Sequence, residues 1–211
     1  MSAPIVLESL DLAALLCSRV CHDLISPVGA IVNGLEVLEE ENDEETKTFA
    51  LDLIKKSARN ASAKLQFCRL AFGAAGSAGV QIDVGDAETM ARGFLEDEKT
   101  RLTWNLPRVL LAKNRVKLLL NMLLIAGQAI PRGGSLTVDP LGEGDAMSFR
   151  ISATGQIARV PPHAAELLAG TPEGAVDAHA IQPFYTGMLA RSCGLTVAVA
   201  AENDTILVTA Q

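Results

Sequence analysis

The sequence contains little cysteine, and its few thiols are not spaced as metal or redox sites require. Four cysteines occur among 211 residues, and none forms a Cys-x-x-Cys pair. Such pairs are the usual signature of zinc sites and of dithiol redox centres. The spacing therefore argues against both, and we expect reduced core thiols at apolar helical positions: Cys17, Cys21, Cys68 and Cys193.

Two further absences narrow the class of protein. The formal net charge is −7, and no long basic tract is present to bind nucleic acid. The longest apolar runs fall short of the roughly 18 residues that a membrane helix needs, and the N-terminus lacks a basic start followed by an apolar stretch. We therefore expect a cytoplasmic protein without nucleic-acid or membrane partners. A hydrophobic content of 49% allows a proper core in one large or two modest domains.

The first third of the chain has helical periodicity. Apolar residues over 10–38 alternate spacings of three and four, and the same pattern returns over 51–72. An acidic stretch separates the two patterns, with Asn42 and Glu45 spaced as a capping box for the second helix. The pattern predicts an antiparallel helical hairpin, and a second copy of the chain would complete a four-helix bundle. We therefore expect a homodimer formed through residues of roughly 5–72.

A stretch of glycine, alanine and serine at residues 73–79 is the expected linker between two domains. The predicted limits are 1–75 for the helical hairpin and 80–211 for an α+β domain with a mostly antiparallel sheet. The strands expected in the second domain span 80–84, 101–106, 135–139, 146–152, 195–200 and 205–209. The expected helices span 86–99, 112–130, 163–169 and 178–192, and Asp86 is the expected N-cap of the first.

His22 is the candidate for chemistry. It opens a His-Asp-Leu-x-x-Pro motif, and because Cys21 occupies an inward position, the ring of His22 is expected to face solvent. An imidazole with a pKa of about 6.5 is substantially neutral near pH 7, so a nitrogen lone pair is available to attack phosphorus. Mostly small residues share its helix face and would leave room for a docking protein: Ser18, Arg19, Ile25, Ser26 and Gly29.

The motif at residues 22–27, on a dimerising helical hairpin, resembles the H-box of sensor histidine kinases. Residues 118–134 are similar to the N-box helix of those kinases and the strand lead-in after it. The resemblance implies that residues 80–211 form an α/β sandwich like the Bergerat-type catalytic and ATP-binding domain of histidine kinases.

Three departures from the kinase pattern concern nucleotide binding. Ile125 stands where the N-box has a second asparagine for magnesium, and Ala153 stands where an aspartate would contact the adenine amino group. The glycine-rich phosphate loop is also missing, because residues 183–189 contain a single glycine. We therefore expect the ATP-binding domain to be degenerate, with no cofactor bound by this chain.

A chain with a phosphorylatable histidine but without the nucleotide-binding boxes is similar to the ChpT family, whose members are dimeric histidine phosphotransferases. Residues 18–29 and 33–36 carry that signature. The resemblance implies a phosphorelay in which His22 accepts a phosphoryl group from the receiver domain of a CckA-type hybrid histidine kinase. The group would then pass to the receivers of CtrA-type and CpdR-type response regulators, which are cell-cycle regulators. Magnesium would be supplied by the partner receiver.

The expected mechanism is attack by Nε2 of His22 on an aspartyl phosphate. Asp23 either orients the imidazole or is a solvated charge, and Arg19 either steadies the transferred phosphate or is a surface side chain. His163 and His179 have no cysteine or carboxylate at metal-ligand spacing, so we expect structural or incidental roles. Two other functions stay open: an active ATP-dependent sensor histidine kinase, and a non-catalytic adaptor that binds receivers.

Overall fold

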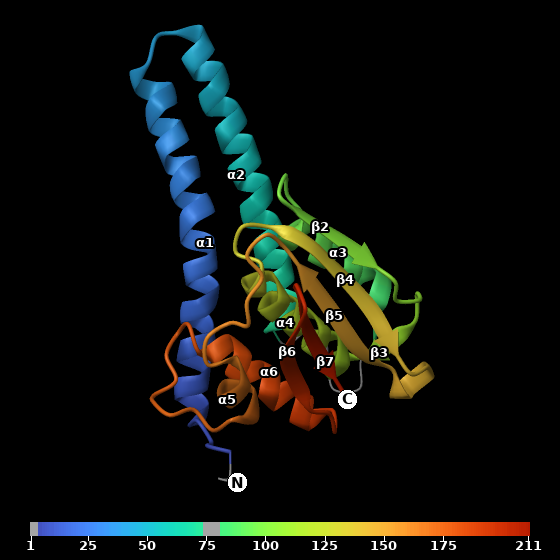
Figure 1. Ribbon diagram of the computed structural model, residues 1–211. Helices are drawn as coiled ribbons and strands as arrows, with labels where there is room; N and C mark the ends of the chain where they lie inside the picture. Colours follow the sequence, from blue (N-terminus) through green and yellow to red (C-terminus); the bar gives the residue numbers. More distant parts are fainter. Residues whose placement is uncertain (1–3, 74–80) are drawn as a thin grey trace.

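The computed structural model describes residues 4–73 and 81–211, which form a long helical hairpin and a domain of sheet and helices (Figure 1). The predicted α+β fold is confirmed. The linker predicted at residues 73–79 lies outside the described residues apart from Gly73. The two domain limits therefore stay predictions.

The hairpin consists of α1 (Ser9–Glu40) and α2 (Glu44–Ala71), as the periodicity predicts. The turn between them ends at Asp43, whose carboxylate accepts hydrogen bonds from the backbone N–H and the hydroxyl of Thr46, both at 2.8 Å. These bonds lower the pKa of Asp43 from its ordinary value. The N-cap is therefore Asp43, and the capping-box prediction of Asn42 is wrong by one residue.

The apolar residues of α1 are divided between two sides of the helix. One side faces α2, where a Cβ built on Gly34 would lie only 2.6 Å from Cγ1 of Ile54. The absence of a side chain at Gly34 therefore lets the two helices approach closely. On the other side lies a row that the single chain leaves uncovered, here called the exposed stripe: Ile25, Val28, Val32 and Leu35.

The cysteines follow the same division. Cys68 of α2 is buried, but Cys17 and Cys21 of α1 are exposed in the single chain. The prediction of core thiols is therefore wrong for these two. Cys21 lies one heptad before Val28, so it belongs to the row of positions that α2 does not cover.

A five-stranded sheet is the centre of the second domain. Its order is β2-β4-β5-β7-β6, with β2 parallel to β4 and every other pair antiparallel. The sheet is therefore mostly antiparallel, as predicted. A separate antiparallel ladder joins β1 to β3. The sequence did not predict β3, because its three residues are too few to show a clear alternation of apolar and polar side chains. The strands are β1 (Gln81–Asp83), β2 (Thr100–Trp104), β3 (Leu110–Ala112), β4 (Gly134–Leu141), β5 (Ser148–Thr154), β6 (Val197–Glu202) and β7 (Thr205–Ala210).

The helices of the second domain build its core against that sheet. Helix α4 is buried on nearly every side and packs against β5 and β7. Helix α3 begins earlier than predicted, because Asp83 and not Asp86 is its N-cap and accepts a 2.6 Å hydrogen bond from the N–H of Gly85. The helices are α3 (Val84–Leu95), α4 (Lys113–Ala129), α5 (Ala164–Ala169) and α6 (Ile181–Ser192), with a 3-10 turn η1 (Gly144–Ala146).

One end of the hairpin is built into this second domain. Phe67 and Ala71 of α2 belong to the main core, and Phe67 stacks on Phe94 of α3 with ring centroids 4.3 Å apart. On α1, Leu12 and Leu16 pack in a smaller apolar cluster with the start of α6. The contacts fix the hairpin to the second domain through both of its helices.

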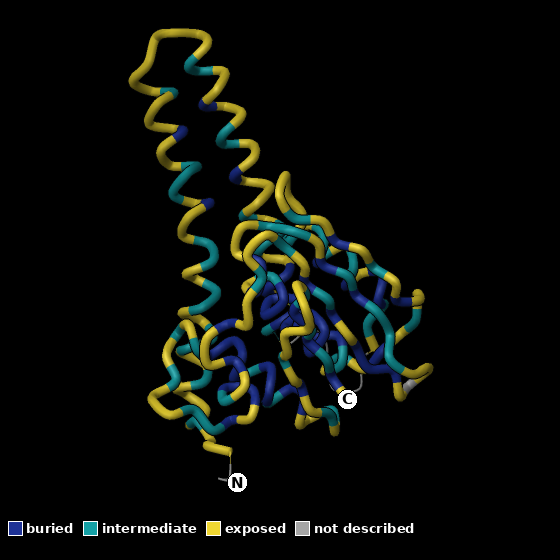
Figure 2. Tube along the Cα trace, viewed as in Figure 1, coloured by how far each residue is buried: buried dark blue, intermediate teal, exposed yellow. Residues whose placement is uncertain are grey.

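The rest of the hairpin extends away from the second domain and is mostly exposed (Figure 2). Residues 9–20 and 61–71 are called the base below, and residues 25–57 the far end. His22 lies between the two regions.

Helix α1 is long and apolar enough, by length and composition, to cross a membrane, and within residues 4–73 and 81–211 it alone meets that criterion. Core helices of soluble proteins and signal sequences meet the same criterion. The search for unbroken apolar runs missed this helix, because its mean hydropathy stays high although isolated polar residues interrupt the runs. The cytoplasmic location stays a prediction.

Candidate functional site

The side chain of His22 is 65% exposed on the flank of α1, in agreement with the solvent-facing position expected from the periodicity. Ser18, Ile25 and Ser26 are exposed around it. A Cβ built on Gly29 would meet nothing within 4 Å, so the surface beyond the ring is open. The structure thus brings these predicted contact residues together on one accessible face.

Asp23 connects the imidazole to Arg19. Its Oδ1 lies 3.6 Å from Nδ1 of His22, and its Oδ2 accepts a 3.2 Å hydrogen bond from Nε of Arg19. The side chain of Asp23 is only 13% exposed, which does not fit the alternative of an ordinary solvated charge. A carboxylate on the Nδ1 side favours the tautomer that carries its proton on Nδ1, and that tautomer leaves the lone pair on Nε2.

Arg19 is less available to a phosphate than its spacing from His22 predicts. Its side chain is 15% exposed and is paired with Asp23 in an i,i+4 ion pair. The charge of the guanidinium is therefore directed at the carboxylate that adjoins the imidazole. Arg19 thus supports Asp23 in this structure, and a direct role in holding phosphate stays a prediction.

Helix α2 contributes two residues whose contact with the site the sequence did not predict. Nζ of Lys64 donates a 3.2 Å hydrogen bond to the backbone carbonyl of Asp23. The thiol of Cys68 is buried, and burial first and the carboxylate of Asp23 second raise its pKa to about 11. Cys68 therefore stays a neutral thiol near pH 7. Nothing in the local sequence signals these contacts, because they join separate helices.

The second domain also reaches the site. His179 lies against His22 in an edge-to-face arrangement, with ring centroids 5.5 Å apart and an interplanar angle of 78°. The expectation of an incidental histidine rested on the absence of metal ligands nearby in sequence. That test could not detect a ring contact between two distant segments.

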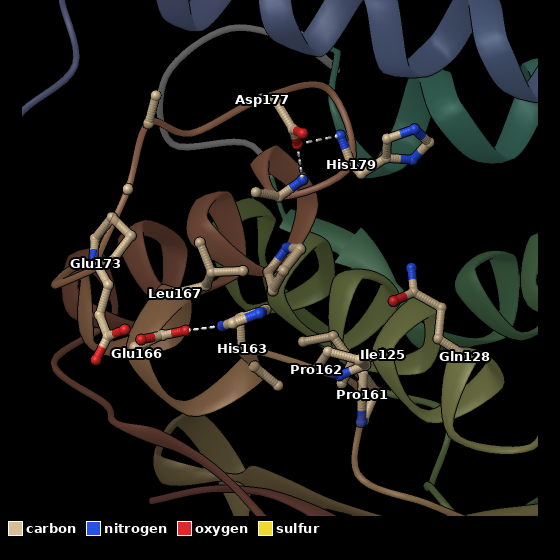
Figure 3. Close-up of a pocket in the computed structure, with 16 residues that line it drawn as sticks. Ile125, Gln128, Pro161, Pro162, His163, Glu166, Leu167, Glu173, Asp177 and His179 are labelled. Carbon is tan, nitrogen blue, oxygen red and sulfur yellow. Dashed lines mark hydrogen bonds and ion pairs between the residues drawn. The ribbon is translucent and has the colours of Figure 1, made fainter.

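The turn that carries His179 is held by Asp177. Oδ1 of Asp177 accepts hydrogen bonds from the backbone N–H groups of His179 and Ala180, at 2.9 and 2.8 Å (Figure 3). These two bonds are the main cause that lowers the pKa of Asp177. The predicted helix start at residue 178 is thus a capped turn, and α6 proper begins at Ile181.

A cavity of about 470 Å³ lies beside this turn, against α4 (Figure 3). Its lining is mostly apolar, its acidic groups are three carboxylates, and two histidines also line it, including His163 in its hydrogen-bonded pair with Glu166. No lysine or arginine is among the described residues that line it. A surface of this charge repels the phosphates of a nucleotide. The lining residues are Ile125, Gln128, Pro161, Pro162, His163, Ala164, Glu166, Leu167, Pro172, Glu173, Gly174, Ala175, Asp177, His179, Ala180 and Pro183.

The residues that the sequence aligns with the nucleotide-binding boxes of histidine kinases have structural contacts here. Asn121 is fully buried, and its Nδ2 donates to the carbonyls of Ala71 and Lys117 at 3.1 and 2.9 Å. Ile125 is 1% exposed and adds no ligand atom. Ala153 is buried within β5. These side chains do not fit a bound ATP and its magnesium.

The segment that stands where histidine kinases have a phosphate loop lies in a helix, as the predicted helix over 178–192 requires. Residues 183–189 lie inside α6, and a Cβ built on Gly187 would lie 2.0 Å from the carbonyl oxygen of Leu168. The glycine therefore serves the close approach of α5 and α6. Among the described residues, no group of three or more histidine, cysteine or carboxylate side chains could hold a metal ion.

The comparisons with known proteins agree with this arrangement. Residues 84–205 match the family model of the histidine phosphotransferase C-terminal domain. The chain is 56% identical over 212 residues to the protein phosphotransferase ChpT of Brucella abortus (strain 2308), and the match covers 100% of both chains. This chain belongs to the ChpT family of histidine phosphotransferases. A solved bacterial phosphotransferase matches this ChpT-family chain with a TM-score of 0.90 and 53% identity, again over 100% of both chains.

Membership in the family confirms the resemblance that the motifs predict. The family model covers the second domain, whereas the two full-length matches also include the hairpin that carries His22. The ChpT-family chain is therefore a transferase of phosphoryl groups with the fold of its relatives.

Proposed function

We propose that this chain carries phosphoryl groups between receiver domains on Nε2 of His22. In the first step Nε2 attacks the phosphorus of an aspartyl phosphate on a receiver. A P–N bond forms, the P–O bond to the aspartate breaks, and the receiver regains its carboxylate. The second step is the reverse reaction on another receiver. The observation that carries the proposal is the exposed ring of His22 with Asp23 on its Nδ1 side.

The partner chemistry follows from the face around His22. Small or exposed residues at Ser18, Ser26 and Gly29 leave clearance for a folded domain, and Ile25 offers it an apolar contact. We propose the receiver of a CckA-type hybrid kinase as the donor and the receivers of CtrA-type and CpdR-type regulators as acceptors. Magnesium is supplied by the acidic pocket of the receiver, and the relay operates in the cytoplasm.

The active unit proposed is a homodimer. The exposed stripe consists of four large apolar side chains between 47% and 69% exposed in the single chain. A continuous apolar row on a helix is the seam of a bundle, and a second hairpin would cover Val28, Val32 and Leu35, while Ile25, one turn from His22, stays available to the receiver. Dimerisation leaves His22 outside the bundle, because its side chain does not belong to that row.

The donor proposed is a receiver and not ATP. Support comes from Ile125, from the amide of Asn121 bonded to Ala71, and from the acidic lining of the cavity. An active kinase would instead label itself from γ-labelled ATP and magnesium. We expect no such labelling of the purified chain, within the period in which a phosphorylated receiver labels it fully.

The decisive experiment is a reconstituted relay with the purified donor receiver. The wild type should acquire phosphate that is acid-labile and alkali-stable, and His22→Gln should acquire none. His163→Gln is the matched control, because it alters another exposed histidine that is paired with Glu166 instead of Asp23. An unlabelled wild type would overturn the proposal.

The adaptor alternative makes a different prediction. A protein that only binds receivers would keep both receiver binding and output of the pathway in the His22→Ala variant. We expect that variant to bind the receiver with unchanged affinity within about threefold but to pass on no phosphate.

A further inference from the structure

The contact between His22 and His179 joins the reacting side chain to the second domain. The two rings meet edge to face at 5.5 Å, although one lies on α1 and the other lies in the turn before α6. Nucleotide binding does not explain the turn that carries His179, because the lining of the cavity beside it does not fit a nucleotide. The contact therefore needs an explanation in terms of His22 itself.

The turn is mounted firmly on the same surface that packs against α1. Asp177 accepts hydrogen bonds from the backbone of His179 and of Ala180. Ala180 belongs to the smaller apolar cluster, together with Leu16 of α1 and Ile181 of α6. The cluster holds α1 against α6, and Asp177 holds the backbone of His179 beside that junction, with the exposed ring of His179 against His22.

Two neighbours consequently define the orientation of the phosphoacceptor ring. Asp23 lies 3.6 Å from Nδ1, and His179 meets the ring at an interplanar angle of 78°. A side chain that is 65% exposed would otherwise rotate among several rotamers. In-line attack on phosphorus requires one narrow range of ring orientations, so restricting the rotamers raises the fraction of productive encounters.

We infer that His179 is a positioning residue for phosphoryl transfer, acting by packing its ring against the imidazole of His22. The inference rests on the proposed role of His22 as phosphoacceptor. It gives the second domain a part in the reaction that requires neither ATP nor a metal ion, since the domain holds the acceptor ring from outside the hairpin.

The test uses the full-length chain and a phosphorylated receiver, with single-turnover rates measured over a range of receiver concentrations. His179→Ala should lower the maximal transfer rate by about 10-fold or more and leave the half-saturating receiver concentration within about twofold. His179→Phe should restore the maximal rate to within about threefold of wild type, because an aromatic edge still packs on the ring. A merely structural role for His179 would not lower the maximal rate alone, and His179→Phe would not restore it.

Two further variants separate the explanations. Asp177→Ala should lower the maximal rate like His179→Ala but less, and Asp177→Asn, which keeps an acceptor oxygen for the turn, should recover most of it. His163→Ala is the control in the same cavity lining and should match wild type. Thermal unfolding of every variant shows whether the fold is kept.

The outcomes distinguish this inference from the proposed function. Transfer at the wild-type rate by His179→Ala would overturn the inference while His22 phosphorylation stands. A change confined to the half-saturating concentration, an equal loss in His179→Phe, or an equal loss in His163→Ala would also overturn it. A wild type that accepts no phosphate would instead refute the proposed function.

Discussion

At the base of the hairpin apolar side chains pack on the second domain, whereas at the far end a row of them is exposed in the single chain. At the base, Phe67 and Ala71 of α2 are fully buried in the core of the second domain. At the far end, Val28, Val32 and Leu35 are each about half exposed in the single chain. The same helical periodicity thus serves packing within the chain at the base, and at the far end it leaves an exposed row for the homodimer proposed above.

This difference explains why His22 lies where it does. Within the base, Leu12 and Leu16 of α1 pack against the second domain, and farther along the helix the proposed second copy would cover the exposed stripe. Between them α1 presents a side chain to solvent while Asp23 and His179 still reach it. The position combines access for a receiver with support from both domains.

The largest effect expected on stability is at the base. Phe67→Ala removes a fully buried ring that stacks on Phe94, and it should lower the free energy of unfolding by about 3–5 kcal/mol. Urea titrations at one protein concentration measure this. Gln66→Ala, at the exposed neighbouring position, should change the same free energy by less than about 1 kcal/mol. Comparable losses in the two variants would contradict the anchoring role of the base.

At the far end, a charge should separate the copies and leave the monomer folded. Val32→Glu introduces a carboxylate into the proposed seam and should raise the dimer Kd by about 100-fold or more. Sedimentation equilibrium measures this directly. Asn42→Glu adds the same charge in the turn and should leave the Kd unchanged. An unaffected Kd for Val32→Glu would remove the exposed stripe as the dimer interface.

Within the second domain, Gly187→Ala should cost about 1–3 kcal/mol, because the new Cβ would lie 2.0 Å from the carbonyl oxygen of Leu168. Gly174→Ala is the control, since nothing lies within 4 Å of a Cβ built there. The variant with the clash should unfold at lower temperature, and the control should not. An equal stability of the two would show that α5 and α6 are not packed closely around Gly187.

The smallest perturbation is chemical and compares two thiols. A pKa of about 11 for Cys68 lowers its thiolate fraction at pH 8 by about 100-fold relative to an ordinary thiol of pKa 9.0. Alkylation of Cys68 should therefore be at least that much slower than alkylation of exposed Cys17. Mass spectrometry of the labelled peptides gives both rates, and similar rates would contradict burial of Cys68.

Cys68 also links stability to pH. Its pKa in the folded chain is higher than the value of 9.0 for a free thiol. The folded state therefore favours the protonated thiol, and this contribution is fully present below about pH 9. It is lost as the pH rises through 9 toward about 11, so the unfolding free energy should fall over that interval in the wild type and less in Cys68→Ala.

Much of the fold follows from periodicity, because a helix or strand that buries one face must repeat its apolar residues. That rule predicts both hairpin helices, the long α4 and most of the short strands along the chain. It does not choose between adjacent caps such as Asn42 and Asp43, since both residue types cap helices. Nor does it tell which row of α1 faces α2, and so the exposure of Cys21 was not predicted.

The candidate site likewise has one part that the local sequence predicts and another part that it does not. The motif around His22 is local, and the four-residue spacing of Arg19 and Asp23 was a signal for their ion pair that the sequence interpretation did not use. The contacts of Lys64 and His179 join segments far apart in the chain. Only the packing of α1 on α2 and on α6 creates them, so no local pattern predicts them.

The buried amide of Asn121 has a consequence for any attempt to engineer nucleotide binding into this domain. It links the end of α2 to α4 through the carbonyl of Ala71, and Gln182 of α6 donates a 2.9 Å hydrogen bond to the Asn121 backbone carbonyl. Turning that amide toward a magnesium ion would remove its hydrogen bond between the hairpin and the second domain. An engineered Ile125→Asn would therefore supply one missing ligand and leave the other committed elsewhere. Kinase activity in this chain would therefore require the loss of a hydrogen bond at the junction that supports His22.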